Sequence, residues 1–180
     1  MRVPAAIPAV LSLALLLGGC ESMPKQPIAT EDSVDIERFM GRWYVVAHIP
    51  TFFFFNDTAT TEIYTLAEDG RIETVFRFRK GGFDGPVKTY TPNGVVKDES
   101  GAIWGMQFIW PFRADYRIVH VDDAYEETII GRQKRDYVWI MTREPQVSDA
   151  AWERLYDIVA AQGYDTSEIR RVPQRWPETP

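Results

Sequence analysis

Between residues 41 and 142 the chain consists of short runs of alternating apolar and polar residues, each ended by turn residues. The clearest run is 102–110, in which every second residue from Trp104 to Trp110 is large and apolar. Successive side chains of a strand point to opposite faces of a sheet, so this period of two predicts strands with one apolar face. Many such short strands separated by turns favour an antiparallel barrel or sandwich.

We expect an all-β domain with one helix near its C-terminus. Ser148 is a good N-cap and Gly163 a natural residue after a helix end, so the helix should lie between them and pack on the outside of the sheet. Ile169–Val172 suggests a short edge strand. An eight-stranded barrel leaves room for one small ligand. The eight expected strands are 42–49, 59–66, 71–79, 86–97, 102–110, 115–121, 127–131 and 137–142.

The first twenty residues have the pattern of a targeting segment. Arg2 supplies positive charge, and the apolar stretch from Ala5 to Leu17 is too short to span a bilayer comfortably. It ends in Leu17-Gly18-Gly19-Cys20, which resembles a bacterial lipobox. We therefore expect residues 1–19 to be a lipoprotein signal peptide and Cys20 to be lipidated, since two or more acyl chains make a stable anchor. An ordinary cleaved signal peptide with a chance cysteine is the alternative.

The expected organisation after the signal peptide has three parts. Residues 20–35 form a flexible polar tether, 36–173 the folded domain, and 174–180 a proline-rich tail that frays. Cys20 is the one cysteine of the chain. Once it is acylated, no thiol remains for a disulfide, a metal site or nucleophilic catalysis.

Residues 52–65 do not fit the alternating pattern, because they begin with four consecutive Phe residues. One interpretation is an apolar lip at the barrel mouth that touches a membrane, and another is a core segment. A third is that the string is not native, since it resembles a translated sequencing-adapter fragment that recurs in assembled metagenomic data. The sequence leaves these three alternatives open.

Three motifs occur in order along the chain: Gly41-Arg42-Trp43, then Val121–Tyr125, then Arg135–Pro145. Together with the lipobox they resemble the lipocalins, and in particular the bacterial outer-membrane lipoprotein lipocalins of the apolipoprotein D-like group. The resemblance covers about residues 35–172 and implies an eight-stranded antiparallel up-and-down barrel. It also implies structural roles for Gly41 and for Trp43, which would close one end of the barrel while Arg143 lies across its ring.

Aromatic side chains on the expected inner faces are the candidates for ligand contact. They supply apolar area, and Tyr and Trp add a polar group for a headgroup. For each of them, ordinary core packing is the alternative. The ligand-binding candidates are Phe76, Phe78, Trp104, Phe108, Trp110, Tyr116, His120 and Trp139.

Nothing in the sequence points to catalysis, and we expect no catalytic residue, metal or cofactor. His48 and His120 are far apart and lack a third ligand at recognisable spacing, and there is no Gly-x-Ser-x-Gly motif or phosphate-binding loop. The formal net charge of -6 without a basic stripe argues against nucleic acid.

The expected function is binding of fatty acids or lysophospholipids, for storage or transport in membrane maintenance. The protein would be anchored to the bacterial outer membrane and face the periplasm. A lipid-modifying enzyme and a structural envelope lipoprotein without a ligand are the alternatives. The sequence leaves open whether the protein forms a homodimer.

Overall fold

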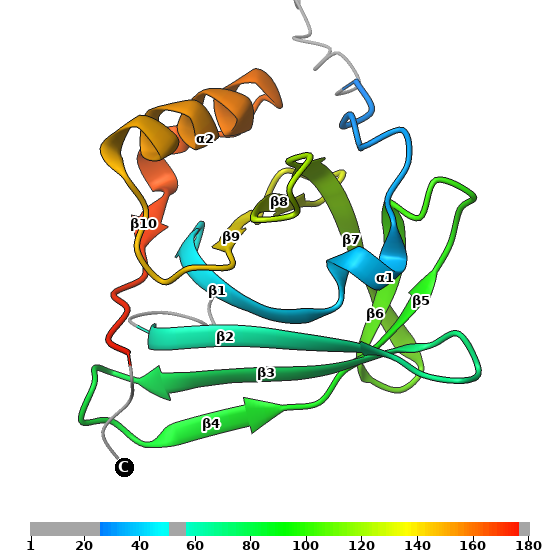
Figure 1. Cartoon of the computed structure of the whole chain (residues 1–180), viewed down its shortest axis with the longest axis horizontal. Coiled ribbons are helices and arrows are strands. Elements are labelled where there is room, and N and C mark those ends of the chain that lie inside the picture. The colour runs from blue at the N-terminus through cyan, green and yellow to red at the C-terminus, as the bar shows by residue number, and fades with distance from the viewer. Residues whose placement is uncertain (1–25, 51–56, 177–180) are drawn as a thin grey trace, which may run out of the picture.

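The strands form one closed antiparallel barrel (Figure 1). The computed structural model describes residues 26–50 and 57–176. Closure comes from β1, which pairs with β2 on one side and with β9 on the other. The strands are β1 Gly41–His48, β2 Asp57–Leu66, β3 Ile72–Lys80, β4 Val87–Tyr90, β5 Asn93–Val96, β6 Ile103–Ile109, β7 Phe112–Val121, β8 Glu127–Gly131 and β9 Trp139–Thr142.

The expected eight-stranded barrel is confirmed, with β4 and β5 together occupying one of the eight positions. They were expected as a single strand, 86–97. The break falls at Pro92, which has no N–H for a sheet ladder; its carbonyl instead accepts a hydrogen bond from Thr74 N at 3.1 Å. β4 pairs with β3 alone, whereas β5 links β3 to β6.

The expected helix is α2, Asp149–Ala161, and it packs against the outside of the barrel (Figure 1). The Ser148 hydroxyl accepts a hydrogen bond from Ala151 N at 3.3 Å, and Gly163 follows the helix with φ of 81°. A short 3₁₀ turn, Thr166–Glu168, leads to β10, Arg170–Arg171, which pairs with the end of β1. Both the helix and the edge strand were predicted from the sequence. The apolar face of α2 consists of Ala151, Trp152, Leu155 and Val159.

A second helix, α1 (Ile36–Phe39), lies across one end of the barrel and was not predicted. It is a single turn, too short to show helical periodicity, and the Asp35 side chain caps it by accepting from Arg38 N at 3.0 Å. Phe39, the last residue of α1, is completely buried. Among helices in the described part of the chain, none is long and apolar enough to cross a membrane.

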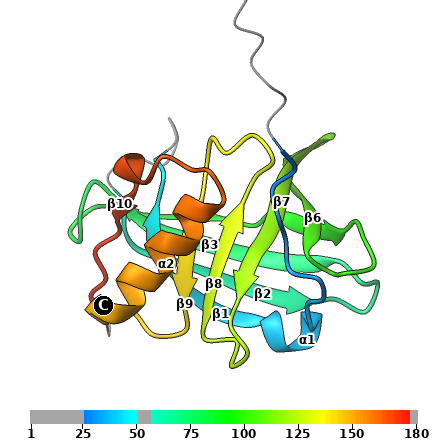
Figure 2. The ribbon, with the colours of Figure 1, turned by 90° about the horizontal axis from the view of Figure 1, so that it is seen from above.

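Residues 26–35, which we call the strap, lie along the barrel wall and are not a free tether. Ile28 is buried, Glu31 N donates to Ile118 O at 3.1 Å, and Val34 N donates to Ser100 O at 2.7 Å. The strap runs from the loop between β8 and β9 at one end of the barrel to α1 at the other (Figure 2). Any flexible tether therefore ends before residue 26. Residues 1–25, including the signal peptide and Cys20, lie outside the described residues.

The folded domain also extends further toward the C-terminus than expected. The Gln174 side-chain amide donates to Val45 O at 2.8 Å and to Thr60 O at 3.2 Å, joining β1 and β2 where they diverge. Trp176 packs on Tyr44 with ring centroids 5.2 Å apart. The expected frayed tail of 174–180 therefore does not begin at residue 174; residues 177–180 lie outside the described range.

Candidate functional site

The end of the barrel beneath α1, which we call the floor, is closed by Trp43 and Arg143. Trp43 is fully buried, and its indole N–H donates to Phe39 O at 2.9 Å. The guanidinium carbon of Arg143 lies 3.7 Å from the centre of the Trp43 ring. Such a cation–π contact contributes roughly 0.5–2 kcal/mol. The arrangement that the sequence resemblance implied for these two residues is present.

Arg143 also connects three separate segments at the floor. Burial lowers the pKa of its guanidinium to about 10, which leaves it charged at pH 7. Gly41, with φ of 94°, allows Arg143 to approach, since a Cβ there would lie 3.3 Å from its Nη1. The floor is therefore structural. Arg143 donates hydrogen bonds to the carbonyl oxygens of Arg38, Phe39, Met40, Arg42 and Tyr125.

The barrel interior contains five of the eight aromatic or histidine candidates for ligand contact. The Trp104 and Tyr116 rings stack with centroids 5.1 Å apart. Toward the other end of the barrel, which we call the mouth, the Phe76 ring is 5.1 Å from Trp139 and 5.2 Å from Phe78. Alternation along β3, β6 and β7 therefore identified interior positions correctly. The five are Phe76, Phe78, Trp104, Tyr116 and Trp139.

The other three candidates lie outside this interior cluster. Phe108 and Trp110 are 45% and 82% exposed, because the β6–β7 hairpin continues beyond the barrel wall. A register shift between Ile118 and His120 reverses the faces of β7, so that Val121, not His120, packs against the interior. The His120 Nδ1 atom lies instead 3.4 Å from Glu31 Oε1 of the strap. The alternation rule fails at such irregularities because each adds a residue to one strand only.

Two further tyrosines line the interior, and sequence reasoning missed both. The Tyr64 and Tyr116 hydroxyls share a hydrogen bond of 2.7 Å. Tyr137, packed against the cluster beside Trp139, has a buried hydroxyl without a hydrogen-bond partner. Burial raises the pKa of Tyr116 and Tyr137 well above the ordinary value, so both remain neutral donors. Tyr137 lies two residues before Trp139 in the expected strand 137–142, so alternation places both on one face and could have identified it.

Strand β2 places an unusual number of polar groups in buried positions. Glu62 is 1% exposed, its Oε2 has no hydrogen-bond partner, and burial raises the pKa of its carboxyl well above 4.5. Among the described residues, seven buried side-chain polar atoms lack a partner. Four of them lie within the questioned segment 52–65, on Asp57, Thr58, Thr60 and Glu62. Native proteins pair nearly all such groups, so this concentration favours the adapter interpretation of the segment.

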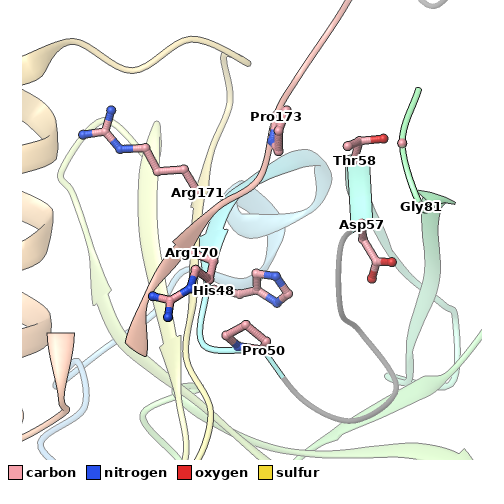
Figure 3. Close-up of a pocket in the computed structure, with 9 residues that line it drawn as sticks. His48, Pro50, Asp57, Thr58, Gly81, Arg170, Arg171 and Pro173 are labelled. Atoms are coloured by element: carbon pink, nitrogen blue, oxygen red, sulfur yellow. The ribbon is translucent and has the colours of Figure 1, made fainter. Parts of the chain in front are cut away.

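A pocket of about 420 Å³ opens where β1 turns away from β2 near the mouth (Figure 3). His48 and Asp57 line it from opposite sides, while the Arg171 side chain turns away and lies over Trp152. Burial lowers the pKa of His48 to about 4 and raises that of Asp57 to about 6. Within the described ranges, no three His, Cys, Asp or Glu side chains are grouped to hold a metal ion.

Comparison with known proteins agrees with this architecture. The family model described as a lipocalin-like domain matches residues 34–174. Temperature-induced lipocalin-1 of Arabidopsis thaliana is 27% identical over 157 residues, covering 83% of this chain and 84% of the relative. Outer membrane lipoprotein Blc of Escherichia coli is 25% identical over 178 residues, covering 92% of this chain and 94% of the relative.

A solved structure gives the same result for the fold. Insecticyanin from the tobacco hornworm Manduca sexta superposes with a TM-score of 0.67 at 11% sequence identity, covering 84% of this chain and 86% of that one. The barrel, the Trp43–Arg143 floor and the match of the family model to most of the chain lead to one conclusion: the chain is a member of the lipocalin family.

Proposed function

We propose that this protein is a lipid-anchored carrier that binds fatty acids or lysophospholipids in the barrel, for storage or transport in outer-membrane maintenance. The observation that carries the proposal is the interior itself. Its walls are mainly aromatic, Tyr137 holds an unpartnered hydroxyl among them, and the buried Glu62 carboxyl acts on both Tyr137 and Tyr116. An apolar cavity with a few placed polar groups is typical of small-ligand sites.

Burial of an acyl chain supplies the binding free energy in this mechanism. Each buried methylene contributes about 0.8 kcal/mol, so about ten give a gross ~8 kcal/mol before the cost of association. The mouth-side residues Phe78, Tyr137 and Trp139 would contact the ligand, because Trp43, Trp104 and Phe39 already fill the floor side. No catalytic group is required for this function.

The location is proposed from two independent observations. The apolar leader of the sequence ends at Cys20 in a lipobox-like motif. The E. coli relative named outer membrane lipoprotein Blc aligns with more than nine-tenths of this chain. The protein would then be attached through Cys20 to the outer membrane and face the periplasm.

The carrier proposal is tested by recovering the ligand. We expect native mass spectrometry of the full chain, purified from membranes, to show a bound lipid of fatty-acid or lysophospholipid mass. Titration of delipidated protein with palmitate should change the emission of Trp139, and Trp139→Phe should remove that change. Absence of bound lipid together with unaltered emission would instead indicate a filled structural barrel. Release of free fatty acid from lysophospholipid during the titration would indicate an enzyme.

Tyr137→Phe should separate ligand binding from stability. Removal of a buried hydroxyl that has no protein partner should leave the free energy of unfolding unchanged or raise it by up to about 1 kcal/mol. Palmitate affinity should fall by about five- to tenfold, because the carboxyl group would lose a hydrogen bond worth ~1 kcal/mol. Calorimetric titration and chemical denaturation provide both readouts.

Tyr116→Phe is the matched control for this prediction. Its hydroxyl is already bonded to Tyr64, so the substitution should lower stability by about 1 kcal/mol through the loss of that bond. Equal palmitate affinity in Tyr137→Phe and the unaltered protein would exclude Tyr137 from the headgroup site.

A further inference from the structure

The tip of the β6–β7 hairpin is the most exposed apolar surface of the described chain. Ile109, Trp110 and Phe112 are 72%, 82% and 75% exposed, and Phe108 on the same hairpin is 45% exposed. The other large apolar residues with exposed side chains reach at most 47%. Contiguous exposed apolar groups of this kind indicate a surface that meets another apolar phase.

This hairpin stands at the mouth, beside the point where the chain enters the fold. Asp115, three residues after Phe112, accepts a hydrogen bond from Gln133 N at 2.8 Å. The Gln133 side chain in turn accepts from Ile28 N of the strap at 3.2 Å. Figure 2 shows the start of the strap and the hairpin at the end of the barrel opposite α1. The strap thus brings the N-terminal chain to the mouth, not to the floor.

The chain upstream of the strap is short enough to hold this end near a membrane. Five residues lie between Cys20 and Gln26. The six residue steps from Cys20 to Gln26 span at most about 3.3–3.6 Å each in extended chain, or roughly 20 Å in all. Lipid on Cys20 would therefore keep the mouth within roughly 20 Å of the bilayer surface.

Charge near the hairpin suits a phospholipid surface. Arg113 follows the tip and is exposed, and the β8–β9 loop beside it carries Arg132, Lys134 and Arg135. Arg132 pairs with Asp136 at 3.2 Å and Arg117 pairs with Asp115 at 2.9 Å, so Arg113, Lys134 and Arg135 supply the remaining positive charge. This local excess of positive charge contrasts with the formal net charge of -6 for the chain. Trp side chains concentrate at membrane–water interfaces, and basic residues next to them attract anionic headgroups.

We propose that the β6–β7 hairpin inserts Ile109, Trp110 and Phe112 into the lipid surface, so that the barrel mouth faces the bilayer. The occupant of this apolar surface is the membrane to which the chain would be tethered. Insertion does not depend on what the barrel binds. Where the carrier proposal also holds, an acyl chain would pass from bilayer to barrel without crossing open water.

Quenching by brominated lipid tests this insertion directly. The full chain, purified with its lipid anchor, is reconstituted in vesicles of phosphatidylethanolamine and phosphatidylglycerol that contain brominated acyl chains. We expect part of the tryptophan emission to be quenched, and Trp110→Phe to lose that quenchable part. The double variant Ile109→Ser, Phe112→Ser retains Trp110, but its emission should no longer be quenched, since the hairpin tip lacks the apolar side chains that would insert into the bilayer.

Val75→Ser is the matched control, because Val75 is 38% exposed on the barrel wall away from the hairpin. The tryptophan emission of Val75→Ser should be quenched to the same extent as that of the unaltered protein. Thermal melting should show that all variants are folded. Equal quenching of the unaltered protein and Trp110→Phe would overturn the proposal. A dimer that forms without vesicles, is detected by sedimentation and buries Trp110 would also overturn it, because a second copy of the chain would then cover the hairpin.

Discussion

Replacement of Arg143 by alanine should lower the free energy of unfolding by about 2–4 kcal/mol, because three of its five hydrogen bonds are part-buried and a carbonyl that loses its donor where water cannot replace it costs ~1–3 kcal/mol. Arg143 donates to five carbonyl oxygens and covers the Trp43 ring. For a domain of this size, such a loss corresponds to a fall in melting temperature of about 5–15 °C. Differential scanning calorimetry provides the measurement.

Arg143→Lys serves as the comparison for this prediction. Lysine keeps the charge but replaces the planar fork with a single ammonium, so it reaches fewer of the carbonyls and should fall between alanine and arginine in stability. Palmitate affinity per folded molecule should remain the same in all three proteins, since the floor is separated from the mouth-side residues. A melting temperature unaffected by Arg143→Ala would contradict the structural role of the floor.

Replacement of Glu62 by leucine should instead stabilise the protein, by about 1–3 kcal/mol at pH 7. The side chain is completely buried and its Oε2 atom has no hydrogen-bond partner. An apolar residue of similar size removes that polar group and packs against the aromatic interior. Denaturation by urea at fixed pH measures the difference.

The pH dependence of that difference identifies the cause. Burial raises the folded-state pKa of Glu62 above its ordinary value of 4.5, so its folded form retains a proton that the unfolded chain releases. Glu62 therefore costs no ionisation energy below pH 4.5, and stability falls as pH rises above it, by up to about 1.4 kcal/mol per pH unit until the folded pKa is reached.

Comparison of the unaltered protein with Glu62→Gln isolates this effect from Asp57 and His48, whose pKa values also change on folding. Glu73→Gln removes an exposed carboxyl from the outer face of β3 and is the control at pH 7, where it should change the free energy of unfolding by less than about 0.5 kcal/mol. A difference between Glu62→Gln and the unaltered protein that does not vary with pH would mean that Glu62 is solvated and not buried.

The result for Glu62 also bears on segment 52–65. A native barrel strand would not be expected to bury two carboxyl groups with unpartnered oxygens together with two unpartnered threonines. If the segment derives from a sequencing adapter, apolar replacements at Thr60 and Glu62 should add to the stability. Tyr137 and the β6–β7 hairpin themselves lie outside this segment, whereas Tyr64, the partner of Tyr116, and Glu62, whose charge contributes to the raised pKa of Tyr137, lie inside it.

Much of the barrel could be predicted from the sequence because alternation and turn residues are local signals. They identified the strands, α2 and five interior aromatics, of which Trp104 and Tyr116 stack together. The remaining features depend on tertiary contacts. The strap is ordered by bonds to Ile118 and Ser100, and α1 by the barrel end that it covers, so neither leaves a periodic pattern.

The strap has a mechanical consequence as well. Its hydrogen bonds to Gln133, Ile118 and Ser100 follow one another along the barrel, and its upstream end lies at the mouth (Figure 2). A pull on the N-terminal chain therefore acts parallel to the strap and loads all of these hydrogen bonds together, in shear. A pull perpendicular to the strap would instead break them one at a time. The domain is built to resist tension along the direction in which a membrane attachment would exert it.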